Sequence, residues 1–336
     1  MKKTLLSVIL WLAALCVCLA VADHVTRRDD GTRKYGPFFE DGQDYDVLFF
    51  GTSRVLDGIS PMELWRDYGI TSYNMGNSSE CLDVTEQVMR LAFERHVPKV
   101  AVVDVYYVDR ELYEPWTYTY RHMFYDELPL SPSKIQAVYA TQPEGGRLEF
   151  LMPFSLYHGR WEELITGTSE RMVECEPFTM GSELRIGRVI PTKYPHTNAV
   201  CEDVLPGHDA LRRIAALCRE YGVEPVFVML PAPISEEEQM AVRSVQRLAQ
   251  ELGVPYLNMT DIGVIDYDAD CYDWLGHLNP DGASKTTAYL GAWLAQRYAL
   301  SDKRGSDISA YWDEHLAQYQ AYWQTLWGDM TLLNAP

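Results

Sequence analysis

The feature that most constrains the fold of this chain is an alternation between short apolar segments and longer amphipathic ones. Apolar runs typical of buried strands lie at residues 45–50, 71–75, 99–106, 224–230 and 255–259. Apolar residues at helical spacing mark residues 61–68, 82–96, 210–221, 235–252 and 283–298. Because a parallel strand pair needs a helical crossover, this alternation predicts βαβ units. We therefore expect an α/β fold with a doubly wound, mainly parallel, flavodoxin-like sheet between two layers of helices.

The alternation is interrupted between about residues 110 and 204, where aromatic residues are frequent. They are Tyr113, Trp116, Tyr118, Tyr120, Phe124, Tyr125, Tyr157 and Trp161. We expect this stretch to be an insertion beside the active face of one domain that covers residues 45–298. Its aromatic rings either bind a ligand at that face or form a small satellite core. The tail, residues 299–336, carries aromatic residues at helical spacing and is predicted to dock as a helix.

The N-terminus has the pattern of an export segment. Lys2 and Lys3 precede an apolar run at residues 5–22, and a polar spacer covers residues 23–44. The run is longer than the apolar core of about 7–15 residues that is usual in a cleaved signal. Its length lies near the lower limit of the about 17–25 residues that a helix needs to span a bilayer. Residues 1–22 are therefore a signal anchor, or a signal peptide cleaved after its small residues 20–22. The two lysines place the body outside the cytoplasm, either anchored in the cell membrane by a single pass or secreted.

Charge and cysteine content exclude two classes of partner. The chain has 29 Lys and Arg residues against 48 Asp and Glu, a net charge of −19, which repels nucleic acid. None of the seven cysteines forms a Cys-x-x-Cys metal motif. The five outside the apolar run allow one or two disulfides without assigning a pair. We expect no metal and no cofactor.

Two local signals are typical of nucleophilic catalysis. A Gly-Thr-Ser turn ends the first strand and presents the Ser53 hydroxyl at a helix start; the alternative is an ordinary helix cap. Asp273 and His277 lie just before the last helix of the domain. A carboxylate that orients an imidazole, which in turn deprotonates a serine, is the logic of a catalytic triad; the alternative is a surface or capping histidine.

A third signal is the turn at residues 74–79 after the second strand, which can offer main-chain N–H donors. All three signals fall at the carboxyl ends of strands, where open parallel sheets bind ligands. The predicted catalytic residues are Ser53 as nucleophile, His277 as base and Asp273 as its orienter. The predicted oxyanion or substrate-binding residues are Gly76, Ser79, Arg54 and Asn77.

Together these segments resemble the SGNH/GDSL hydrolase superfamily. Gly51-Thr52-Ser53 is similar to its first block, with Thr in place of the usual Asp, the turn at 74–79 to its second, and Asp273 with His277 to its last. Residues 277–282 and the N-terminal segment resemble a membrane-anchored subgroup that accompanies membrane-bound O-acyltransferases and acts on exopolysaccharide or teichoic acid. The resemblance implies an extracytoplasmic esterase or O-acyltransferase that acts on acyl esters, chiefly acetyl esters, of a cell-surface glycan. The aromatic rings of residues 110–204 would then stack on sugar rings.

The chain departs from this family in two places. Three residues separate Asp273 from His277 where the family has two, so Asp270 is an alternative orienter. The third strand reads Val103-Asp104-Val105-Tyr106 at its end and lacks the family's Asn, whose side chain donates to the oxyanion. The oxyanion hole, the set of donors that stabilises the oxyanion, must then use main-chain N–H groups at Ser53 and residues 76–79, helped by a Tyr hydroxyl or Arg54.

The missing Asn leaves other functions open. One alternative is a catalytically degenerate SGNH-like subunit that binds glycan or docks a membrane-bound acyltransferase. Another is a binding protein whose Ser and His coincide by chance.

Overall fold

The core of the molecule is a sheet of five parallel strands. The structure, a computed structural model, describes residues 2–26, 34–112, 117–128, 130–166 and 175–333. The strands are β1 (Val47–Phe50), β2 (Ser72–Asn74), β3 (Val100–Asp104), β4 (Glu224–Met229) and β5 (Tyr256–Asn258). Their spatial order is β2-β1-β3-β4-β5, with Val47 opposite both Ser72 and Val100. This is the order of flavodoxin-like doubly wound sheets, and it confirms the predicted fold class.

Helices occupy the connections between strands. Those that follow or cover the sheet are α3 (Ser53–Gly58), α4 (Pro61–Tyr68), α5 (Leu82–Arg95), α11 (Pro206–Tyr221), α12 (Glu236–Leu252), α13 (Met259–Ile262) and α14 (Pro280–Arg297). The five predicted helices are confirmed, with the largest shift at α11, which begins at Pro206 rather than residue 210. The start of α12 is fixed by a capping box: Ser235 Oγ accepts the Glu238 N–H at 3.2 Å and Glu238 Oε2 accepts the Ser235 N–H at 2.9 Å.

Alternate side chains of each strand enter two separate cores. Leu48 and Phe50 of β1 pack in the larger core with residues of α5, α11 and α12. Val47 and Phe49 pack on the other face with residues of α3, α4 and α14. Because helices cover both faces, β1, β3 and β4 carry apolar residues on both sides, which explains their largely apolar sequences.

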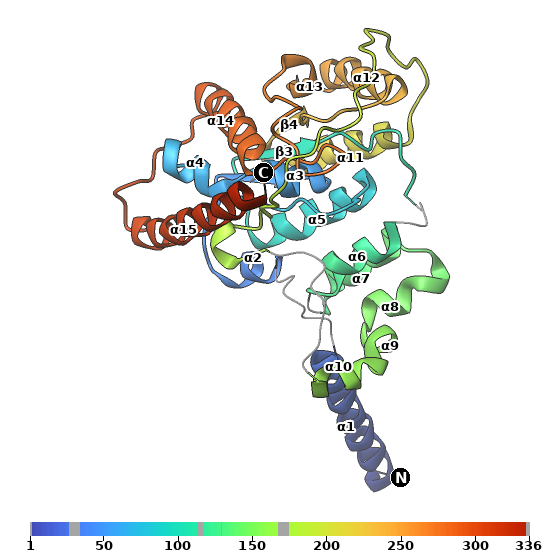
Figure 1. Cartoon of the computed structure of the whole chain (residues 1–336). Helices are drawn as coiled ribbons and strands as arrows, with labels where there is room; N and C mark the ends of the chain where they lie inside the picture. The colour runs from blue at the N-terminus through green and yellow to red at the C-terminus, as the bar shows by residue number, and fades with distance from the viewer. Residues whose placement is uncertain (1, 27–33, 113–116, 129, 167–174, 334–336) are drawn as a thin grey trace.

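The predicted insertion folds into short helices and one extended segment. The helices are α6 (Tyr118–Tyr125), α7 (Pro132–Thr141), η2 (Glu144–Gly146), α8 (Arg147–Leu151), α9 (Phe154–Tyr157), η3 (His158–Arg160), α10 (Trp161–Thr166) and η4 (Pro177–Thr179). Figure 1 shows α6 to α10 stepping down from the sheet toward α1 (Lys2–Thr26). Residues 182–205, here called the strap, then run without helix or strand to α11.

Both ends of the chain are helical. In the described part of the chain, α1 alone is long and apolar enough to cross a membrane, over the 21 residues Lys3–Asp23, and that window is not buried in the body; a signal sequence has the same properties. A short α2 (Gly36–Glu40) follows it, and α15 (Ser309–Leu333) closes the chain. Trp312 and Tyr319 of α15 are fully buried, and the Tyr319 hydroxyl donates to Glu63 Oε1 at 2.9 Å, so the predicted docking of the tail is confirmed. All seven cysteines are free.

Candidate active site

The turn that presents Ser53 is fixed by its neighbours. Gly51 has φ +142°, and a Cβ there would lie 2.6 Å from the Cβ of Asp104 at the end of β3. Thr52 donates its hydroxyl hydrogen to Asp104 Oδ2 at 3.0 Å and accepts the Arg54 N–H at 3.2 Å. Ser53 is consequently the first residue of α3, where a main-chain N–H has no carbonyl of its own helix to bond.

Ser53, His277 and Asp273 form one hydrogen-bonded chain. Ser53 Oγ lies 2.8 Å from His277 Nε2, and His277 Nδ1 lies 2.7 Å from Asp273 Oδ2. Asp273 Oδ1 also accepts the main-chain N–H of His277 at 3.0 Å. A carboxylate at Nδ1 favours the tautomer with its proton on Nδ1, which leaves Nε2 free to accept the serine proton.

The three residues between Asp273 and His277 form a turn that brings the two side chains together. Gly276 donates its N–H to Asp273 O at 3.1 Å and has φ +74°, a conformation that favours glycine. Next to this turn, Cys271 and Leu278 form an antiparallel bridge. The unusual spacing is therefore compatible with a paired Asp and His.

The alternative orienter Asp270 has other partners. Its two carboxylate oxygens lie 2.8 and 2.7 Å from Lys285 Nζ, and Oδ2 accepts the Asp266 N–H at 2.7 Å. The structure therefore pairs Asp273, not Asp270, with His277.

Electrostatics keep the imidazole neutral. Burial, together with the positive charge of Arg54, lowers the pKa of His277 below its ordinary value, and the bond to Asp273 opposes this only in part. Burial acts to raise the pKa of Asp273, but the hydrogen bonds from His277 outweigh it and leave that pKa below the usual range. A neutral His277 beside an ionised Asp273 is the protonation state that a general base requires.

The Arg54 side chain binds the loop that precedes His277 rather than facing Ser53. Its Nη1 donates to Gly276 O at 2.6 Å and its Nη2 to Leu275 O at 2.7 Å, and the guanidinium lies 5.1 Å over the Tyr106 ring. The residue is 5% exposed. Its expected role as an oxyanion donor is thus replaced by one in positioning.

Two of the three residues predicted from the turn at 74–79 have their donors engaged elsewhere. The Gly76 N–H donates to Asn74 Oδ1 at 3.0 Å, and the Asn77 N–H donates to Gly51 O at 2.9 Å. The Asn77 side-chain amide donates to Tyr120 O at 3.1 Å. A Cβ at Gly76 would lie 2.7 Å from Leu56 N, so this glycine lets α3 approach the turn. The oxyanion assignment of Gly76 and Asn77 is corrected on these grounds, whereas Ser79 remains a candidate.

A cavity of about 630 Å³ opens in front of the triad. It is lined by Ser53, Asp57, Ser78, Ser79, Tyr107, Tyr120, Glu183, Arg185, Tyr272, Asp273, Leu275 and His277. Of the predicted aromatic residues, Tyr120 reaches this cavity, and Phe124 and Tyr125 are buried in the larger core. Tyr113 and Trp116 lie outside the described residues.

Two lining residues that the sequence analysis missed support the histidine from the side. The Tyr272 ring stacks on the His277 imidazole, with centroids 5.7 Å apart and planes at 17°. Its hydroxyl donates to Asp57 Oδ2 at 2.9 Å. Asp57 is 3% exposed, and burial, then the charge of Glu183, raises its pKa. The spacing of four residues from Ser53 was the available signal, because it places Asp57 on the same helix face.

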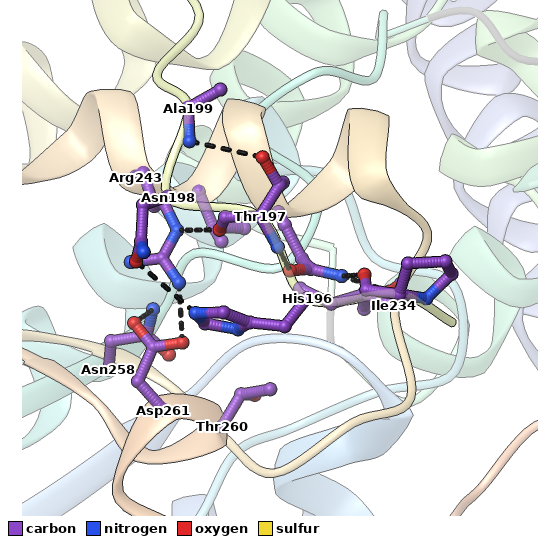
Figure 2. A network of polar contacts seen from close by, with 12 residues as sticks. His196, Thr197, Asn198, Ala199, Ile234, Arg243, Asn258, Thr260 and Asp261 are labelled. Carbon is purple, nitrogen blue, oxygen red and sulfur yellow. Dashed lines mark hydrogen bonds and ion pairs between the residues drawn. The ribbon is translucent and has the colours of Figure 1, made fainter. Parts of the chain in front are cut away.

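The strap supplies Glu183 and Arg185 to the cavity, and a polar network fastens it further along. Figure 2 shows Arg243 of α12 between Thr197 of the strap and Asp261 of α13. Arg243 Nε donates to Thr197 O at 2.9 Å, and Nη2 donates to Asp261 Oδ1 at 2.7 Å. A second cavity of about 250 Å³ lies against this network. The hydrogen bonds of Arg243 to Thr197 and Asp261 tie the strap to α12 and α13 beside this cavity.

No protein-family model matches the chain, and no curated protein matches its sequence. In the parts of the chain that the structure describes, no group of three or more His, Cys, Asp or Glu residues is placed to hold a metal ion.

Proposed function

We propose that the chain is a serine esterase or O-acyltransferase of the SGNH type, with Ser53, His277 and Asp273 as its triad. The observation that carries the proposal is the continuous hydrogen-bonded chain from Asp273 through His277 to Ser53. These residues come from the two ends of the domain, 224 positions apart for Ser53 and His277. A serine, a neutral imidazole and a carboxylate in this order form an activated nucleophile.

The mechanism follows from the charges. His277 Nε2 takes the Ser53 proton, and Ser53 Oγ attacks an ester carbonyl to form a tetrahedral oxyanion. The main-chain N–H groups of Ser53 and Ser79 are the donors we assign to that oxyanion, because those of Gly76 and Asn77 are engaged. His277 then gives the proton to the departing alcohol as the first tetrahedral intermediate collapses to an acyl-serine. His277 next takes a proton from water or a sugar hydroxyl, whose oxygen attacks the acyl carbon, and returns it to Ser53 Oγ as the acyl–Oγ bond breaks.

The substrate class is an acyl ester, acetyl foremost, of a cell-surface glycan. The cavity holds a group of sugar size, and its walls combine Tyr107, Tyr120 and Tyr272 with carboxyl and guanidinium side chains. Aromatic faces beside hydrogen-bonding groups suit sugar rings and hydroxyls. A net charge of −19 disfavours nucleic acid as a partner.

The location we propose is the outer side of the cell membrane. α1 is retained as a single-pass anchor, and the lysines in its first turn hold the N-terminus in the cytoplasm. The apolar window of 21 residues, Lys3–Asp23, supports retention, because it is longer than the apolar core of about 7–15 residues usual in a cleaved signal. A membrane-bound O-acyltransferase is the partner that such an anchor would bring within reach.

One observation favours a second function. The donating Asn that the family places after its third strand is missing here, and the last residue of β3, Asp104, is buried and accepts from Thr52. A site with a weakened oxyanion hole would serve as a non-catalytic subunit that binds glycan or docks an acyltransferase.

Labelling of Ser53 separates the two functions. The full chain in detergent is treated with a fluorophosphonate probe, with Ser53→Ala as the control. An enzyme is labelled at Ser53 and releases acetate from p-nitrophenyl acetate, and Ser53→Ala does neither. A wild-type chain that is not labelled would leave the binding subunit as the function.

A further inference from the structure

The insertion meets α1 where the apolar window of that helix ends. Asp23 is the last residue of the window Lys3–Asp23, and its Oδ1 accepts the N–H of Phe154, the first residue of α9. Three residues on, Thr26 O accepts from Arg160 Nη1 at 3.3 Å in η3. Figure 1 shows α9 and α10 beside this end of α1, while the rest of α1 extends away from the body.

These contacts fix the height of the insertion relative to a bilayer. A helix rises about 1.5 Å per residue, so a window of this length spans roughly 30 Å, the thickness of the hydrocarbon core. With the window in the core, Asp23 lies at the outer boundary and Thr26 lies about 4–5 Å beyond it, among the headgroups. The segments bonded to Asp23 and Thr26 lie at the same level.

Residues 154–166, here called the foot, include exposed apolar side chains and an aromatic–cation pair at that level. Leu156 is 41% exposed and Ile165 is 77% exposed. Arg160 lies 5.8 Å over the Tyr157 ring, a pairing of aromatic and cation that suits a membrane interface. Single exposed apolar residues are ordinary on the surfaces of soluble proteins. The position of Leu156 and Ile165 beside α1 is therefore what indicates a contact with the membrane.

We propose that the foot is a second membrane contact, lying in the headgroup layer of the outer leaflet with Leu156 and Ile165 against the acyl chains. This inference rests on the retention of α1 as an anchor. The occupant of the surface is the lipid bilayer itself. Because the chain carries a net charge of −19, apolar burial rather than attraction to anionic lipid drives the contact. A helix alone is a single tether, whereas a helix and a foot together fix the orientation and height of the catalytic cavity.

The test measures lipid contact at single positions of the full chain in phosphatidylcholine nanodiscs. Cys16, Cys18 and Cys201, the cysteines that are not buried, are replaced by alanine, and an environment-sensitive NBD fluorophore is attached at Ile165→Cys. Leu156→Cys probes α9 independently. The matched control is Val204→Cys, on the strap, because Val204 is 78% exposed. Val8→Cys in α1 reports insertion of the anchor.

We expect NBD at positions 165 and 156 to emit at shorter wavelength than at 204 and to lose intensity with spin-labelled lipid, as at position 8. If NBD at positions 165 and 156 is no more quenched or blue-shifted than at position 204, while NBD at position 8 is quenched, the proposed membrane contact of the foot is refuted and the anchor is supported. If position 8 is not quenched, both fail. Quenching at 165 that requires anionic lipid would overturn the apolar basis of the contact.

Discussion

Replacing Asp273 with asparagine keeps the shape of the side chain but exchanges an acceptor for a donor. Asp273 Oδ1 accepts the His277 N–H at 3.0 Å, while Oδ2 faces Nδ1 at 2.7 Å. In Asp273→Asn only the amide oxygen can accept the main-chain N–H, which leaves the NH2 group facing Nδ1. A donor at that position favours the tautomer with its proton on Nε2, and this tautomer cannot take the Ser53 proton.

The size of the effect follows from that tautomer. In a serine protease the same exchange lowers kcat about 10⁴-fold, or about 5 kcal/mol at about 1.4 kcal/mol for each factor of ten. We expect Asp273→Asn to lower turnover of p-nitrophenyl acetate about 10³–10⁴-fold. Asp273→Ala should lower it less, because a water molecule in the vacated space can accept from Nδ1 and restore the productive tautomer.

The matched control is Asp270→Asn. Asp270 is 1% exposed and bonds Lys285 with both oxygens, so its loss should lower Tm while turnover stays within a few-fold of wild type. Turnover is measured with the full chain in detergent, and Tm by scanning fluorimetry. The reasoning is refuted if Asp273→Asn stays within tenfold of wild type, or if Asp270→Asn loses as much turnover as Asp273→Asn.

Three further expectations follow from the same site. Ser53→Ala and His277→Ala should each remove nearly all triad-dependent turnover, and the double variant should be about as slow as either, since the residues act as one unit; additive losses in single-turnover assays would contradict this. Because the pKa of His277 is lowered by burial, kcat/KM should fall only as pH drops below the ordinary imidazole value of about 6.5, and a midpoint above that value would be inconsistent. Gly51→Ala places a Cβ 2.6 Å from that of Asp104 at a φ of +142°, so unfolding measured in urea should be about 1–3 kcal/mol easier, and an unchanged midpoint would argue against the strain.

The amino-acid sequence alone is enough to predict the sheet and the placement of Ser53 and His277 at its edge. Apolar runs bounded by turns predict strands because a strand covered on both faces has no room for polar residues. Ser53 and His277 were identifiable because each follows a strand or precedes a helix at an edge where parallel strands converge. These signals are local, so they can be read without tertiary information.

Tertiary structure decided which donors and carboxylates serve the site. Asp270 and Asp273 look equivalent in the sequence, and only the contact between Asp270 and Lys285 assigns them different roles. Arg54 follows the nucleophile directly, yet its guanidinium reaches the carbonyls of residues 275 and 276.

The partners of His277 and the contacts of the foot also could not be predicted from the sequence. Tyr272 stacks on His277, and its hydroxyl donates to Asp57, which lies 215 positions away in the sequence. The contact of α9 with Asp23 spans 131 positions. Hydrogen bonds and ring contacts of this kind depend on side-chain direction and on which segments the fold brings together. Periodicity reports only which face of an element is apolar, so it cannot reveal which polar group on one segment meets which group on another.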